Sequence, residues 1–309
     1  MTNNQTLCPK SLADMQSAKD GDYNTELSWV GMEQIDLPVE IEGKPITAKV
    51  NAGINLLAVE SGEKGIHMSR LYLLLDTLTQ QEITPLVLKD TLNAFLKSHH
   101  SQSSEASIEI SGDILLSRKS LNSNLFGWKA YPLKLTAKMH RVLSLHLQVG
   151  IPYSSTCPSS AALSRQVTQL KFRQDFGKRI DRLPLEEVAR WLGESGMPAT
   201  PHSQRSWAWV NIKLAADAEK IPVKKLIDVC ETALGTAVQT VVKRSDEQAF
   251  AVANGQNLMF CEDAARTLKR ALISENCCDA FDIRIEHQES LHPHNAVARV
   301  NWTGENNAT

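Results

Sequence analysis

The stretch Ile151-Pro-Tyr-Ser-Ser-Thr-Cys157-Pro-Ser-Ser160 gives the first indication of how this chain is organised. It follows a strand-like run over residues 141–149 that ends at Gly150, and its serines and prolines favour a turn. We therefore expect Cys157 to lie on a loop, where a thiolate could bind a metal or act as a nucleophile. A single cysteine is more often a small buried apolar residue or an unreactive thiol. The role of Cys157 therefore depends on the imidazoles and carboxylates that follow it.

The composition sets broad limits. The chain has 309 residues, of which 42% are hydrophobic and 22% charged, with a net charge of −2. This length suffices for a large core or two related units, and the near-neutral charge argues against a nucleic-acid-binding protein. The N-terminus lacks the basic and apolar regions of a signal peptide, and no apolar run approaches the roughly 20 residues of a membrane helix. We expect a cytoplasmic protein with reduced thiols at Cys8, Cys157, Cys230, Cys261, Cys277 and Cys278.

Apolar periodicity predicts an α+β chain with two units. A loosely ordered segment, 1–25, precedes a first unit over 26–140. A second unit follows over 141–303 with a helical insertion at about 161–200, and a polar tail spans 304–309. The expected strands and helices are an extended run at 29–58 broken at 43–45 and 51–53, an apolar extended run at 71–75, a helix at 84–97, strands at 107–116, 128–149 and 206–214, helices at 222–239 and 259–273, and strands at 280–286 and 295–302.

Two short motifs favour a duplicated unit. Ile66-His67-Met-Ser-Arg70 and Pro201-His202-Ser-Gln-Arg205 each introduce an apolar run that reads as extended. Their matching placement makes duplication a better explanation than chance.

Further stretches could carry chemistry. Glu289-Ser-Leu-His292-Pro-His294 places one carboxylate and two imidazoles in a predicted turn between strands, which is unusual for a plain hairpin loop. Lys243-Arg-Ser-Asp-Glu247 reads as a solvated charged loop, and the charges of the 161–200 insertion as a solvated face. Glu262 opens a predicted helix, where the simplest interpretation is an acid paired with Arg266 four residues later.

Four side chains could form a metal site. Cys157, His202, Glu247 and His292 all fall at the ends of predicted strands or helices. A thiolate, imidazoles and a carboxylate can hold a catalytic metal and leave one position open for water. Their spacing matches no short zinc motif, so the residues alone leave this set a hypothesis.

Six motifs together resemble the prokaryotic type IB GTP cyclohydrolase I. They are GIHMSR, CPSSAALSRQ, PHSQRS, KRSDE, NGQNLMFCEDAAR and ESLHPHNAVA, and they occur in the order and spacing of that family from about residue 30 to residue 302. Each motif is weak alone, but six in order are specific.

This resemblance implies a fold and an assembly. The expected fold is the tunnelling fold, in which each of two tandem units combines an antiparallel sheet with a pair of helices. Such units oligomerise into barrels, so we expect a homotetramer with sites shared between chains. The expected partners exclude nucleic acid and membrane.

The resemblance also implies the reaction. GTP and water would give 7,8-dihydroneopterin triphosphate and formate, the entry to folate-type pterins. Cys157, His202 and Glu247 would match the ligands of one divalent metal ion, which could be zinc, manganese or ferrous iron. Glu262 would match the residue that holds guanine. Glu289 and His292 would match the acid/base pair, with His292 close enough to touch the metal.

The triphosphate and two departures from the family complete these expectations. Because the chain has no P-loop, cationic side chains must bind phosphate. The candidates are Arg205, Lys243, Arg244 and Arg70. Ser159 stands where the family often has a second cysteine, which puts a redox switch in doubt, and the segment between Cys157 and His202 is longer than in short members.

Two other functions stay open at this stage. A tunnelling-fold nitrile reductase of queuosine biosynthesis would use Cys157 as a covalent nucleophile and NADPH as the hydride donor. A non-catalytic purine- or metal-binding protein would bind guanine nucleotides tightly without releasing formate.

Overall fold

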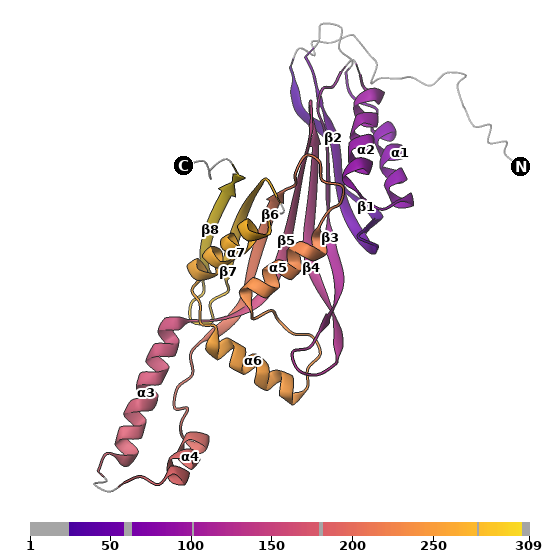
Figure 1. The fold of residues 1–309 in the computed structure, drawn as a ribbon. Helices are drawn as coiled ribbons and strands as arrows, with labels where there is room; N and C mark the ends of the chain where they lie inside the picture. The colour runs from indigo at the N-terminus through magenta and orange to yellow at the C-terminus, as the bar shows by residue number, and fades with distance from the viewer. Residues whose placement is uncertain (1–24, 59–63, 101, 179–181, 277, 305–309) are drawn as a thin grey trace, which may run out of the picture. The chain divides into compact units, whose positions relative to one another are not determined.

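The computed structural model describes residues 25–58, 64–100, 102–178, 182–276 and 278–304, and Figure 1 shows its fold. The expectations for residues 1–25 and 304–309 fall almost wholly outside this part of the chain, as do Cys8 and Cys277. No helix in the described ranges is long and apolar enough to cross a membrane.

Eight strands form one sheet, and each strand lies beside the next strand in the sequence. The β1–β2, β2–β3, β5–β6, β6–β7 and β7–β8 pairs are antiparallel. The strands are β1 (Leu27–Ile41), β2 (Lys44–Leu56), β3 (Ala106–Lys119), β4 (Phe126–Met139), β5 (Leu143–Thr156), β6 (Ser203–Lys213), β7 (Ala280–His287) and β8 (Ala296–Thr303). An antiparallel sheet with helices confirms the predicted α+β class.

Seven α-helices and one 3₁₀ helix lie between these strands in the described residues. They are α1 (Met68–Asp76), η1 (Thr77–Gln80), α2 (Pro85–Ser98), α3 (Pro158–Phe176), α4 (Leu185–Glu194), α5 (Val223–Leu234), α6 (Arg244–Gln256) and α7 (Cys261–Glu275). The order of two strands, helices and two strands therefore occurs twice. The second occurrence carries α3 and α4 between its first two strands and α6 among its helices, so the segment expected as an insertion at about 161–200 contains two helices.

Contacts divide the chain into two compact units. Unit 1 comprises Met1–Ser111 and Leu135–Leu145, and unit 2 comprises Gly112–Lys134 and His146–Thr309. This division differs from the expected boundary at residue 140, because β3, β4 and β5 each contribute residues to both units.

Unit 1 buries one face of its strands under two helices (Figure 1). Alternate β2 residues such as Ile46, Ala48 and Val50 are buried, as the sequence pattern predicted. Thr84 caps α2 by accepting a hydrogen bond from the Val87 N–H at 3.2 Å, and Pro85 occupies the first helical position. The core leucines and phenylalanine of the two helices are Leu71, Leu75, Leu88, Leu92 and Phe95.

Unit 2 builds its core in the same way. On β6 and β7, Val210, Ile212, Ile283 and Ile285 are buried against the helices. Cys230 is fully buried in α5, as predicted, and Leu268 in α7 packs on the same side of the sheet. Burying a leucine side chain stabilises a fold by roughly 2 kcal/mol. Leu268 therefore helps to hold α7 against the strands.

Several predicted boundaries are wrong. Residues 51–53 do not interrupt β2, and β5 continues through Gly150 to Thr156, because backbone pairing with β6 holds it extended. The 71–75 run is helical, since Leu71 and Leu75 four residues apart face the core. The 128–149 run is two strands, β4 and β5, with a turn between them.

The helices of unit 2 also differ from the prediction. The 222–239 helix ends at Leu234, because Gly235 adopts a left-handed conformation with φ of 72°. Helix α6 was missed entirely, since its few apolar residues do not form a helical stripe and its first turn was interpreted as a charged loop.

Candidate metal and substrate site

Cys157 and His202 meet because of strand register. In the antiparallel β5–β6 pair, Thr156 lies opposite Ser203, so Cys157 and His202 are the next residues on the two strands. The Cys157 N–H donates to the His202 carbonyl oxygen at 3.2 Å. Cys157 therefore lies at a strand–helix junction, half-buried, instead of within a longer loop.

The first turn of α3 supports this pair. Cys157 is the N-cap of α3, and its sulfur accepts a hydrogen bond from the Ser160 N–H at 3.5 Å. The Ser160 hydroxyl oxygen in turn accepts from the His202 N–H at 3.1 Å. Ser160 therefore bonds both to the Cys157 sulfur and to the His202 backbone, which holds these two residues together.

The His202 ring is oriented by two oxygen acceptors. Its Nδ1 lies 2.9 Å from the Gln204 Oε1 and 3.6 Å from the Glu289 Oε2. If Nδ1 carries the proton and donates it to Gln204, then Nε2 keeps a lone pair for a metal or a proton. The Gln204 amide is itself held by its donation to the Ser155 hydroxyl at 2.7 Å.

Glu289 reaches His202 through the β6–β7 register. Ser206 pairs with His287, and the Gln288 N–H then donates to the Arg205 carbonyl oxygen at 3.1 Å. This continuation places Glu289 opposite Gln204, which agrees with the contact between Glu289 and the His202 ring. His202 therefore contacts both of the other predicted residues, Cys157 through the backbone and Glu289 through its ring.

Glu262 approaches the same corner from α7. The Met259 N–H donates to the Thr156 carbonyl oxygen at 3.2 Å, so the start of α7 is tied to the residue before Cys157. Glu262 is exposed and accepts a hydrogen bond from the Cys261 thiol at 3.3 Å. The predicted pair of Glu262 with Arg266 is wrong, because Arg266 pairs with Asp263 at 3.2 Å. Asp263 is the better partner since it already caps the helix.

Two buried groups, His287 and Cys261, lie beside Glu262, and the sequence analysis gave neither of them a part in the site. Burial lowers the pKa of His287 to about 4, against the opposing effect of the Glu262 charge. The His287 Nε2 lies 2.8 Å from the Tyr153 hydroxyl oxygen. Burial, reinforced by the neighbouring Glu262 carboxylate, raises the pKa of the Cys261 thiol to about 11. Both groups are therefore uncharged near neutral pH, beside the Glu262 carboxylate.

Glu247 lies in the first turn of α6 and lines a hollow of about 410 Å³ in unit 2. Arg205 and Gln204 line the same hollow, and the Gln204 amide oxygen also contacts the His202 ring. Lys243 and Arg244 form the exposed start of α6.

Asp246 fixes this helix start and was also missed. It is fully buried and accepts four hydrogen bonds: from Lys243 N–H at 2.8 Å, Asn122 N–H at 2.7 Å, Ser123 N–H at 2.8 Å and the Ser123 hydroxyl at 2.6 Å. The Ser123 hydroxyl and backbone N–H hold the pKa of Asp246 well below its usual range. The only sequence signal was an acid three residues after a helix N-cap.

The side chains of two further predicted residues contact other groups. His292 is exposed in the loop between β7 and β8, where its ring stacks on His294 with centroids 4.9 Å apart. Arg70 belongs to unit 1, and its guanidinium donates to the Ser98 carbonyl oxygen at 3.0 Å. Within the described residues, no group of three or more His, Cys, Asp or Glu side chains is close enough to hold a metal ion.

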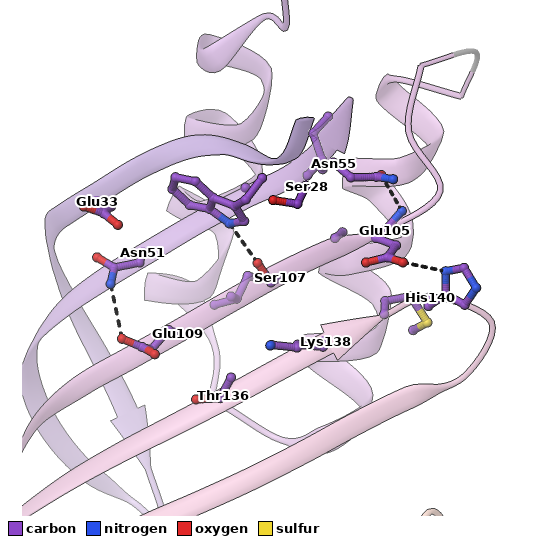
Figure 2. Close-up of a pocket in the computed structure, with 16 residues that line it drawn as sticks. Ser28, Glu33, Asn51, Asn55, Glu105, Ser107, Glu109, Thr136, Lys138 and His140 are labelled. Atoms are coloured by element: carbon purple, nitrogen blue, oxygen red, sulfur yellow. Dashed lines mark hydrogen bonds and ion pairs between the residues drawn. The ribbon is translucent and has the colours of Figure 1, made fainter. Parts of the chain in front are cut away.

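A second hollow, of about 450 Å³, lies in unit 1 and contains none of the predicted residues (Figure 2). Several of its polar side chains pair with one another. The Trp29 indole N–H donates to the Ser107 hydroxyl at 3.0 Å, Asn51 donates to Glu109 at 3.2 Å, and His140 lies 3.2 Å from Glu105. We assign this hollow no part in the reaction.

Comparison with known proteins identifies the family. The model of a family described as type I GTP cyclohydrolase folE2 matches residues 12–298. A protein named GTP cyclohydrolase FolE2 from Klebsiella pneumoniae is 68% identical to this chain, and the alignment covers 96% of this chain and 100% of that one. A protein of the same name from Serratia proteamaculans is 58% identical, and that alignment covers 96% of each chain. A protein of the same name in Pseudomonas putida is 50% identical over 91% of this chain and 92% of its own.

Among solved structures, uricase from Arthrobacter globiformis aligns with a TM-score of 0.49 at 7% identity, covering 92% of this chain and 96% of that chain. That likeness is too low to bear on function. The family match spans nearly the whole chain and includes every residue of the Cys157 corner. The chain belongs to the type I GTP cyclohydrolase folE2 family.

Proposed function

We propose that this chain is a type IB GTP cyclohydrolase I, which hydrolyses GTP to 7,8-dihydroneopterin triphosphate and formate as the first step of folate-type pterin synthesis. The observation that carries the proposal is the geometry where β5, β6 and β7 end, in a chain of this family. There the backbone of Cys157 bonds to that of His202, and the His202 ring lies 3.6 Å from the Glu289 carboxylate. Such a corner offers a metal ligand pair and a proton-transfer group within one site.

The donor set suits one divalent ion. The Cys157 sulfur and the His202 Nε2 would be the first two ligands, because Gln204 already occupies the His202 Nδ1. Glu247 would add an oxygen ligand, and His292 a second imidazole. One thiolate with nitrogen and oxygen donors accepts manganese and ferrous iron as well as zinc. Since no three such groups are gathered in the described residues, binding would have to draw Glu247 or His292 toward the pair.

When bound, the metal would supply Lewis acidity, which makes water a nucleophile near neutral pH. The residues of the chain would do the rest. Glu262 would accept hydrogen bonds from the N1–H and 2-amino group of guanine. His292 would protonate N7, which makes C8 electrophilic, and Glu289 would take up and return protons beside it. An imidazole suits this donor role because it titrates near working pH.

The triphosphate would lie toward the start of α6. Arg205 lines the hollow that contains Glu247, and Lys243 and Arg244 begin the helix that carries Glu247. Three cationic side chains at one end of a metal site complement a triphosphate. Arg70 is the weakest of the four candidates, since its guanidinium already binds a backbone carbonyl in unit 1.

The proposed assembly is a homotetramer of tunnelling-fold chains in the cytoplasm, with sites shared between subunits. The supporting observation is that β1 and β8 end the strand order, so among the described strands each has a neighbour on one side only. Unpaired edges are usually covered, and pairing between copies would do so.

The test is formate release from GTP by the purified, metal-free protein, before and after manganese, ferrous iron or zinc is added back. We expect formate and a fluorescent pterin product to appear together only in the metal-loaded samples. NADPH oxidation with a nitrile substrate would instead indicate the reductase. Tight GTP binding without formate in any sample would indicate a binding protein.

A further inference from the structure

Outside the Cys157 corner, unit 2 carries the helical segment formed by α3 and α4, which we call the arm. The two helices pack together through one aromatic cluster. The Trp191 ring of α4 lies edge-on to Phe172 at 5.1 Å and to Phe176 at 6.1 Å. The Trp191 indole N–H also donates to Asp175 at 2.8 Å. The inner face of α3 is therefore already occupied.

A second apolar stripe lies on the opposite face of α3. Leu163, Val167 and Leu170 follow one another at spacings of four and three residues, which places them on one side of the helix. They are 62%, 42% and 52% exposed. Phe172 and Phe176 fall roughly half a turn away from this stripe, so α4 does not cover it.

Helix α4 presents a matching stripe. Leu185 and Leu192 are seven residues apart on one side of α4, and they are 79% and 58% exposed. A single exposed leucine is ordinary, but two exposed apolar stripes on helices that pack together are typical of a protein–protein contact.

The charges of the two helices indicate what covers these stripes. Helix α3 carries three basic residues and one acidic residue, a net charge of +2, while α4 carries three acidic residues and one basic residue, a net charge of −2. A surface made of one basic and one acidic helix is complementary to itself after a two-fold rotation. In that arrangement α3 of each copy meets α4 of the other.

We propose that the arm is a docking surface for a second copy of this chain, with the α3 stripe of one copy packed against the α4 stripe of its partner. The contact would bury the five stripe residues and pair charges at its rim. Arg173 beside the α3 stripe and Glu186 beside the α4 stripe are the best placed rim pair, since each lies within one turn of its stripe.

This contact would also bear on the metal corner. Cys157 is the N-cap of α3, and its sulfur and carbonyl oxygen both accept hydrogen bonds from the first turn of that helix. A copy docked along α3 would hold that turn in place. The proposal does not depend on the reaction, because it concerns association alone.

The first experiment measures the mass of the full-length protein by sedimentation over a 100-fold range of concentration. We expect the double variant Leu163→Glu with Leu170→Glu to have at most half the wild-type mass, with an unchanged near-UV circular dichroism spectrum. The matched control is Leu73→Glu with Leu86→Glu, which changes two exposed helical leucines in unit 1 and should keep the wild-type mass. A wild-type mass for the arm variant over the whole range would overturn the proposal.

The second experiment exchanges the rim charges. Arg173→Glu and Glu186→Lys should each raise the dissociation constant of the complex between copies about tenfold. The effect is this large because a two-fold interface contains each substituted residue twice. An equimolar mixture of the two variants should associate at near the wild-type constant, because Glu at 173 then meets Lys at 186. A mixture that associates no better than the separate variants would contradict α3–α4 pairing between copies.

Discussion

The two histidine motifs look alike in sequence and differ in structure. His67 is the N-cap residue of α1, and its backbone N–H donates to the buried His99 Nε2 at 3.2 Å. His202 precedes strand β6, and its ring faces Gln204 and Glu289 while its backbone meets Cys157. The first histidine joins a helix to its neighbour, whereas the second lies where three strands end.

The difference shows that antiparallel register creates the site. His67 follows the second strand of its unit and introduces a helix, but His202 comes before the second strand of its unit. The two positions are therefore not equivalent, and the prediction that both motifs introduce extended runs is wrong for His67. Only at His202 does a strand pair bring a cysteine and a histidine to the same end of the sheet.

The largest expected effect concerns Cys157. Cys157→Ala should lose bound metal and GTP turnover together, with turnover reduced at least about 100-fold, because a missing ligand weakens the site more than a missing supporting residue does. The fold should survive, since the residue is half-buried at a strand end. Metal content by elemental analysis, turnover and melting temperature provide the measurement, and full metal occupancy with normal turnover would refute the assignment.

The histidine comparison gives the second prediction. His202→Ala should reduce metal affinity and turnover about 10- to 100-fold or more, whereas His67→Ala should leave turnover within about twofold. Both changes remove a half-buried imidazole, so the pair is matched in size and burial. Equal losses of turnover in the two variants would mean that unit 1 contributes to the reaction in a way the corner geometry does not explain.

Much of the fold could be predicted from sequence because periodicity reports burial. Alternation at Ile46, Ala48 and Val50 identified a strand, and the Thr84-Pro85 cap located α2 within a residue. Helix α6 could not be found this way, since the hydrogen bonds that fix its start come from Asn122 and Ser123, far away in sequence. Helix-capping contacts across such a distance leave no local pattern.

The site was predictable in its residues but not in its supports. The motifs singled out Cys157, His202 and Glu289, which lie at the same end of β5, β6 and β7. Gln204 was quoted only as part of a motif, because its role depends on lying two residues along a strand from His202. The buried pair Tyr153 and His287 depends on the β5–β6–β7 register, which no single segment reveals.

Glu262 gives the third prediction. Glu262→Gln replaces an accepting oxygen with a donor, which would oppose the guanine N–H groups, so kcat/KM for GTP should fall at least about tenfold with normal folding and metal content. The matched control is Arg266→Ala. Because Arg266 pairs with Asp263 and not with Glu262, its removal should change stability by no more than about 0.5 kcal/mol and leave kcat/KM unchanged. Unchanged kinetics in the Glu262 variant would remove the guanine assignment.

The smallest expected effect is on the pH dependence of stability, and it concerns the buried histidine of the corner. Burial lowers the pKa of His287 to about 4, while an unfolded histidine titrates at about 6.5. Between these values the unfolded chain binds a proton that the folded chain does not. The free energy of unfolding is therefore highest above pH 6.5, and it falls as pH falls toward 4. The loss should reach about 2 kcal/mol at pH 5 relative to pH 7.

His287→Gln keeps a partner for the Tyr153 hydroxyl but cannot titrate, so the difference in unfolding free energy between pH 7 and pH 5 should shrink by that amount. Urea denaturation of both proteins at the two pH values measures it, and an identical pH dependence would show that His287 is not held neutral.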